Sequence, residues 1–251
     1  MKILGIESSS LVASVAVVTD GLVTAEYTVN LKKTHSQTLL PMIDEVTRIL
    51  ELDLNDVDAI AVSGGPGSYT GLRIGSATAK GLGLALNKPL VHVPTMDAMA
   101  YNLYGTSALI CPVMDARRGQ VYTGLYHYED AFEVVKPQCG MDIHELTGEL
   151  NARGERVIFL GDGVPVSEKV IRETLRVPFS FAPAQCNRQR GASVAALGSV
   201  YFAEGKTVSA MDHAPDYLRK AQAERELEEA KRQGKTEELA AGHSVGTGDV
   251  Q

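Results

Sequence analysis

The chain has 251 residues, which is enough to bury a sizeable core and predicts two small domains. Its formal net charge of −7 argues against unaided binding of nucleic acid, because phosphate contacts need clustered Lys and Arg. The sequence has no apolar run long enough to span a membrane and no secretory signal, so we expect a cytoplasmic location and no membrane partner. Its three cysteines, Cys111, Cys139 and Cys186, are widely spaced, so we expect them to be reduced thiols.

The first hundred residues carry the signals of three strands followed by a helix, a strand and a second helix. Asp20-Gly21 is a hairpin signal between the second and third strands. Leu39, Ile43 and Val46 form an apolar stripe on the first helix. The predicted order is βββαβα, with strands 2–6, 12–18 and 22–28, helix 36–50, strand 59–62 and helix 68–86.

The same order recurs after a short strand at 90–93 and a helix at 95–103. The repeat predicts an α/β fold made of two ribonuclease-H-like βββαβα halves. The second half is predicted as strands 109–114, 120–126 and 132–135, helix 142–150, strand 157–160 and helices 166–175 and 192–204. The expected domains are 1–103, 104–220 with the C-terminal helices, and a tail of 221–251 in which a charged helix at 221–233 precedes a disordered stretch.

The segment from Ser63 to Leu86 combines a glycine-rich turn with a long helix. Ser68 is the predicted N-cap, because its hydroxyl can accept a hydrogen bond from the first helical turn. Within the helix, small residues recur every four positions and therefore share one face, namely Gly71, Gly75, Ala79 and Gly83. Helical glycines cost roughly 0.5–1 kcal/mol each relative to alanine, so this face needs a packing reason. It can receive a core helix of the same chain or a helix of a second chain, and the pattern does not decide between the two.

Equivalent turns in the two halves have the layout of a nucleotide cleft. An acid follows the first strand of each half, and a glycine turn follows the fourth. Glycine turns at helix N-termini can present N–H groups to phosphates, and carboxylates opposite them can hold Mg²⁺ through water. The alternative is that these are the turns that the fold needs and that the cleft is vestigial, which we favour. The candidate residues are Glu7, Ser8, Gly65, Gly67, Asp115, Gly161 and Gly163.

Other catalytic signatures are missing from the sequence. No two histidines are spaced three or four apart, no HExxH or Walker lysine motif occurs, and Ser8, Ser9 and Ser68 have no GxSxG elbow around them. We therefore predict no catalytic residue and no metal site in this chain.

Several segments together resemble the bacterial TsaB family, over roughly residues 1–219. They are KILGIESSS, THSQTLLPMIDEV, GGPGSYTGLRIGSATAKGLGLAL, MDARRGQVY, YFAEGKT and PDYLR. The resemblance implies the duplicated fold of actin, sugar kinases and heat-shock chaperone ATPases. It also implies a part in making threonylcarbamoyladenosine on tRNAs that read codons beginning with A. In that family the catalytic paralogue TsaD transfers the group, TsaB is its dimerisation partner, and a small ATPase, TsaE, joins the pair.

The resemblance also implies where the partner binds. Family members pair with TsaD, or with a second TsaB, through the two helices that match 36–50 and 68–86. The expected interface residues are Leu39, Met42, Ile43, Val46, Gly71, Leu72, Gly75, Ala79, Leu82 and Gly83. On this reading Gly75→Trp abolishes pairing and leaves the monomer folded, whereas loss of folding would place the stripe in the internal core.

We therefore predict a non-catalytic scaffold subunit that contacts tRNA only through the complex and requires no cofactor of its own, with ATP and Mg²⁺ acting elsewhere in the assembly. The first turn supports this, because Leu11 follows Glu7-Ser8-Ser9-Ser10 where the catalytic paralogue carries an acid. The alternative is an ATP-dependent small-molecule kinase in which Glu7 or Asp115 assists a Mg–ATP site.

Overall fold

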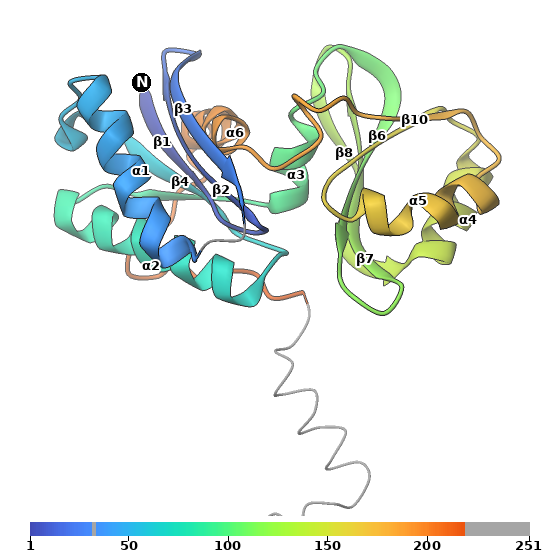
Figure 1. Cartoon of the computed structure of the whole chain (residues 1–251). Coiled ribbons are helices and arrows are strands. Elements are labelled where there is room, and N and C mark those ends of the chain that lie inside the picture. The colour runs from blue at the N-terminus through green and yellow to red at the C-terminus, as the bar shows by residue number, and fades with distance from the viewer. Residues whose placement is uncertain (32–33, 219–251) are drawn as a thin grey trace, which may run out of the picture. The chain divides into compact units, whose positions relative to one another are not determined.

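A computed structural model describes residues 1–31 and 34–218, and these residues contain two five-stranded sheets (Figure 1). The predicted helix at 221–233 and the predicted disordered stretch after it lie outside the described residues. Ser68 caps α2 as predicted, with its side chain accepting a hydrogen bond from the N–H of Gly71. The first-half elements are β1 (Lys2–Glu7), β2 (Val12–Thr19), β3 (Leu22–Asn30), α1 (His35–Ile49), the 3-10 helix η1 (Leu54–Asp56), β4 (Ala59–Ser63), α2 (Tyr69–Leu86), β5 (Leu90–Val93) and α3 (Thr95–Ala100).

The two sheets have the same strand order, which confirms the predicted duplication. The first sheet runs β3-β2-β1-β4-β5, and the second runs β8-β7-β6-β9-β10. In each sheet the first three strands are antiparallel, and the last two join in parallel. The second-half elements are β6 (Thr106–Asp115), β7 (Gln120–Tyr128), β8 (Phe132–Asp142), α4 (Ile143–Arg153), β9 (Val157–Leu160), α5 (Val164–Thr174), β10 (Phe179–Phe181) and α6 (Gly191–Ala203).

The first sheet is buried between two helical layers. On one face, α1 and α2 cover the side chains of Leu4, Ile6 and Val15. On the other face lies α6 (Figure 1). It packs against the side chains of Ile3 and Ala61. The approach of α6 is close because Gly198 has no side chain: a Cβ there would lie 2.5 Å from the Cβ of Ala61.

The helices that follow each half are exchanged between the sheets. After the first half, α3 packs on β6 and β7 of the second sheet, where Met96 and Met99 join its core. After the second half, α6 returns to the first sheet. We predicted the C-terminal helix 192–204 as part of the second domain, and this placement is wrong, because its apolar residues Val194, Ala195 and Leu197 fill the open face of the first sheet. The other face of the second sheet is covered by α4 and α5.

Two strands differ most from the predicted elements. Strand β8 was predicted to end at 135 and extends to Asp142, and β10 was not predicted. Both are edge strands, which pair on one side only. Among the described residues, no helix is long and apolar enough to span a membrane.

Candidate functional site

The acidic turn after β1 is buried and held by hydrogen bonds within its own half. Glu7 is 1% exposed, and its Oε1 accepts a hydrogen bond from the N–H of Ser9 at 2.6 Å. Burial raises the pKa of the Glu7 carboxyl to about 7, although the hydrogen bond from the Ser9 N–H opposes this rise. The Ser8 hydroxyl donates to the carbonyl of Gly71 at 2.9 Å. These side chains therefore tie the turn to α2.

The glycine turn before α2 is packed against that acidic turn. A Cβ on Gly67 would lie 2.4 Å from the carbonyl oxygen of Ser9, and Gly65 has a φ of +114°. Three of the N–H groups that could hold a phosphate are already engaged. Gly64 donates to the carbonyl of Val93 at 2.8 Å, Gly65 to the Thr95 hydroxyl at 3.2 Å, and Ser68 to the carbonyl of Ser9 at 2.6 Å. In this turn the glycines allow close contact between chain segments, as the alternative interpretation expected.

The second half repeats this arrangement. Gly161 and Gly163 lie against the end of β6, where added Cβ atoms would lie 2.2 Å from the carbonyl oxygen of Val113 and 2.7 Å from the carbonyl carbon of Met114. Gly163 also donates to the carbonyl of Val113 at 3.0 Å. Asp115 accepts a hydrogen bond from the N–H of Arg117 at 2.7 Å. The candidate cleft residues thus pair within each half, and nothing in their geometry requires a nucleotide.

Metal coordination has no support in the part of the chain that the structure describes. No cluster of three or more His, Cys, Asp or Glu side chains there could hold a metal ion. His35 is buried and forms a hydrogen bond within the chain, because its Nε2 lies 2.8 Å from the carbonyl oxygen of Ser10.

The small-residue stripe of α2 faces the interior of the chain, so its assignment to a partner helix is wrong. Gly71 and Gly75 lie against Ser8, with a Cβ on Gly75 only 2.1 Å from the Ser8 hydroxyl. Ala79 is fully buried, and a Cβ on Gly83 would lie 2.9 Å from the Cβ of Ala210. The stripe exists because α2 sits directly on the acidic turn and on the C-terminal segment.

The other predicted interface side chains are also buried in the monomer. All but Leu72 belong to the core between the first sheet and its helices, Leu72 is buried as well, and only Leu82 is partly exposed. This set comprises Leu39, Met42, Ile43, Val46, Leu72 and Leu82. A side chain that the monomer already buries is not free to pack against a second chain.

A different face of α1 and α2 is open to solvent. On α2, a second row with a spacing of four is exposed, and no described residue lies within 4 Å of a Cβ built on Gly81. Arg73 lies over the Tyr69 ring and donates to its hydroxyl at 3.0 Å. We call this surface the outer face; it consists of Leu40 on α1 and Tyr69, Arg73, Ala77, Gly81, Leu84 and Ala85 on α2.

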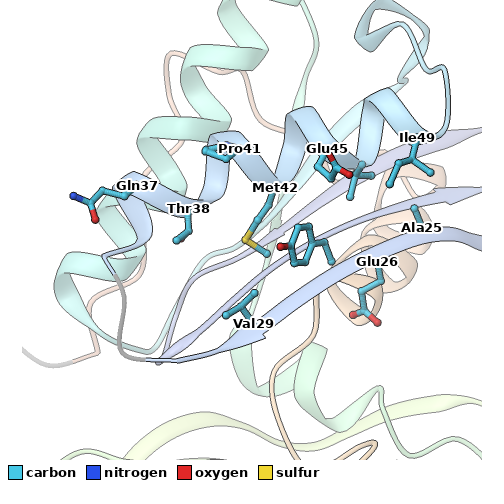
Figure 2. A pocket seen from close by; sticks show the side chains of 11 residues that line it. Ala25, Glu26, Val29, Gln37, Thr38, Pro41, Met42, Glu45 and Ile49 are labelled. Carbon is cyan, nitrogen blue, oxygen red and sulfur yellow. The ribbon is translucent and has the colours of Figure 1, made fainter.

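A groove of about 750 Å³ runs between β3 and α1, and sequence reasoning missed it (Figure 2). Met42 and Val46 line it from α1, and Val29 lines it from β3. Its two carboxylates are engaged, since Glu26 pairs with Arg190 and Glu45 with Arg48. The groove therefore suits apolar side chains. The signal that could have revealed it is the alternation of Ala25, Tyr27 and Val29 on an edge strand.

Comparison with known proteins identifies the family. The chain is 34% identical to the tRNA threonylcarbamoyladenosine biosynthesis protein TsaB of Bacillus subtilis, over 89% of this chain and 96% of that protein. The TsaB of Escherichia coli is 33% identical, over 87% of this chain and 95% of that protein. The chain belongs to the TsaB family. The resemblance found in the sequence is thereby confirmed.

Two further matches agree with TsaB membership. A family model described as TsaD, tRNA N6-adenosine threonylcarbamoyltransferase, matches residues 23–227. The solved structure of YeaZ from Pseudomonas aeruginosa superposes with a TM-score of 0.74 at 24% identity, covering 86% of this chain and 99% of that one. At this identity the superposition supports the fold, which is the same in this TsaB-family chain and in YeaZ.

Proposed function

We propose that this chain is a non-catalytic subunit in the biosynthesis of threonylcarbamoyladenosine on tRNA, where it binds a TsaD-like catalytic paralogue. The named relatives support this pathway over the small-molecule kinase alternative. The observation that carries the non-catalytic reading is the engagement of the glycine-turn N–H groups within the chain. With the N–H groups of Gly64, Gly65 and Ser68 used in this way, the turn has fewer donors to offer a phosphate.

The outer face is the proposed partner surface. It combines exposed apolar side chains with the open position at Gly81, where a helix backbone can approach closely. Leu40 and Leu84 are 55% and 54% exposed, and with the 43% exposed Tyr69 they place three apolar side chains on α1 and α2. In the absence of the paralogue, the same face would pair two copies of the chain.

The remaining partners follow from the same proposal. A TsaE-like ATPase would join the pair and supply the dependence on ATP and Mg²⁺, and this chain would need no cofactor of its own. Its net charge of −7 favours tRNA contact through the complex. The work would take place in the cytoplasm, where tRNA is modified.

The test is the solution mass of the chain, measured by light scattering on a sizing column, alone and mixed with the catalytic paralogue of the same cell. We expect a dimer alone and a one-to-one heterodimer in the mixture. Gly81→Trp should weaken pairing at least about tenfold, because the bulky ring occupies the contact surface, which corresponds to 1.4 kcal/mol or more.

Gly148→Trp is the matched control. Gly148 is likewise a helical glycine, on α4 of the second half, and no described residue lies within 4 Å of its Cβ position. This variant should pair like the unmodified chain. A monomer that ignores the paralogue would refute the proposed function, and normal pairing by Gly81→Trp would refute the outer face as its site.

A further inference from the structure

The C-terminal segment of the described chain runs antiparallel along α2. We call residues 207–218 the strap. It is anchored at one end by Val208, which exchanges two backbone hydrogen bonds with Leu90 of β5, each at 2.9 Å. At the other end, the N–H of Asp216 donates to the carbonyl of Gly64 at 2.6 Å. Between these anchors the strap meets α2 where Ala210 lies against Gly83, Met211 against Lys80 and His213 against Ser76 and Lys80. Just beyond the second anchor, the Tyr217 ring packs against that of Tyr69.

His213 is the buried centre of the strap. Its side chain is 3% exposed, and its Nδ1 is hydrogen-bonded to the Ser76 hydroxyl at 2.9 Å. Its Nε2 is buried and has no hydrogen-bond partner among the described residues. A protonated imidazole carries two N–H donors, so protonation would leave one of them without an acceptor.

Most of the charged groups around His213 disfavour a positive charge on its imidazole ring. Lys80 of α2 donates to the carbonyl oxygens of Met211 and His213, at 2.9 and 3.0 Å, and so places its ammonium beside the ring. His92 of β5 packs with its ring centroid 5.4 Å from that of His213, and it pairs with Asp216 of the strap at 3.1 Å. Asp216 alone favours the charge. Burial, with smaller contributions from His92 and Lys80, lowers the pKa of His213 to about 4.

We propose that the strap is a releasable clasp on α2, pinned by neutral His213, and that protonation of His213 detaches the strap and leaves the two sheets folded. Release uncovers Ser76 and also Gly83, the member of the small-residue stripe that lies against Ala210 of the strap. The strap adds only Ala210 and the partly buried Val208 to the core of the first sheet, and its other contacts lie on α2, on β5 and at the Gly64 turn. Release therefore leaves most of that core in place.

The direction of the pH effect follows from the protonation states. The released strap binds a proton near pH 6.5, whereas the docked strap resists it until about pH 4. Docking is therefore fully favourable above pH 6.5 and weakens about tenfold for each pH unit between these two values. Between pH 7.5 and pH 5 the population of released strap should rise about 30-fold.

Amide hydrogen exchange of the full chain, corrected for the intrinsic effect of pH on exchange, measures this population. The N–H of Asp216 reports the strap, and the amides of β1 report the whole fold. We expect protection of Asp216 to fall about 30-fold from pH 7.5 to pH 5 while protection in β1 stays higher and does not follow it. Equal loss of protection in β1, or no change at Asp216, would overturn the proposal.

Two variants and a control sharpen the test. His213→Asn keeps a polar atom for Ser76 and cannot be protonated, so the pH dependence at Asp216 should disappear. The control is His144→Asn, at an exposed position on α4, which should retain it. Lys80→Met removes the two hydrogen bonds that the Lys80 ammonium donates to the strap and should lower Asp216 protection already at pH 7.5, with β1 unaffected. A pH dependence that persists in His213→Asn, or unchanged protection in Lys80→Met, would contradict the clasp, and the Lys80 variant remains informative if His213→Asn does not fold.

Discussion

Gly75→Ala tests whether the small-residue stripe of α2 faces the interior. The added methyl group would lie 2.1 Å from the Ser8 hydroxyl, which is fully buried and donates to the carbonyl of Gly71. Overpacking of this kind costs roughly 1–3 kcal/mol. Displacing a buried hydroxyl from its acceptor costs roughly another 1–3 kcal/mol. The higher helix propensity of alanine offsets about 1 kcal/mol of this, so the free energy of unfolding should fall by about 3 kcal/mol.

The assay is urea unfolding followed by circular dichroism, with Gly81→Ala as the matched variant. Both substitutions add the same atoms to the same helix, and the Cβ of the second meets no described residue within 4 Å. Gly81→Ala should therefore raise the free energy of unfolding by about 0.5–1 kcal/mol. The two variants should change stability in opposite directions.

A second substitution identifies the contact that causes the loss. Ser8→Ala removes the clashing hydroxyl and leaves the Ser8 Cβ at 3.4 Å, an ordinary contact distance. The double variant Ser8→Ala with Gly75→Ala should be at least about 1 kcal/mol more stable than the sum of the single effects predicts. If Gly75→Ala were as stable as Gly81→Ala, the interior position of the stripe would be refuted, and the interpretation of the stripe as an open groove for a partner helix would return.

Two further predictions concern buried or partly buried acids. The folded chain holds a proton on Glu7 up to about pH 7, whereas the unfolded chain releases it near pH 4.5, so the free energy of unfolding falls by up to about 3 kcal/mol as the pH rises through this window. Glu7→Gln should remove this pH-dependent part of the stability in urea titrations at pH 5 and pH 7.5. If stability changed with pH in the same way in both chains, the assignment to Glu7 would be contradicted. Glu26 accepts hydrogen bonds from Arg190 and from the N–H of Ala192, so Glu26→Ala should lower the free energy of unfolding by about 1.5–3 kcal/mol. Glu45 forms an exposed pair with Arg48, so its removal should change stability by less than about 0.5 kcal/mol. Equal effects of the two substitutions would show that the link between β3 and α6 adds no stability.

The order of elements was predictable because the local patterns are strong. Strands β1 and β4 are nearly continuous apolar runs, as expected for strands covered on both faces. The glycine turn and the Ser68 cap mark the start of α2 unambiguously. Such signals lie within a few residues of each other, so no tertiary information is needed to recognise them.

The missed strand segments have local reasons. Strand β8 contains Pro137 and Gly140, which normally argue against a strand. At the edge of a sheet a proline is tolerated, because the missing N–H can face away from the neighbouring strand. Strand β10 has only three residues, Phe179–Phe181, and is too short to show a period.

The orientation of α2 could not be predicted from spacing alone. The helix carries two rows of mostly small residues, one containing Gly75 and Ala79 and the other containing Ala77 and Gly81. Both rows have a spacing of four, and helical periodicity treats them alike. What decides between them is the contact of Gly75 with Ser8, sixty-seven positions earlier in the chain, which no local pattern encodes.

The exchange of α3 and α6 has a consequence for synthesis on the ribosome. The strands β1 and β4 emerge early, yet the helix that covers one of their faces ends at Ala203. Until that helix has left the exit tunnel, Ile3 and Ala61 have no cover and the nascent first half exposes an apolar sheet face. The first half therefore cannot complete its fold before the second half has been synthesised, unlike a chain that folds domain by domain from the N-terminus. Because the contacts between the first sheet and α6 are far apart in the sequence, folding should be slow and should depend on protection of the unfinished chain.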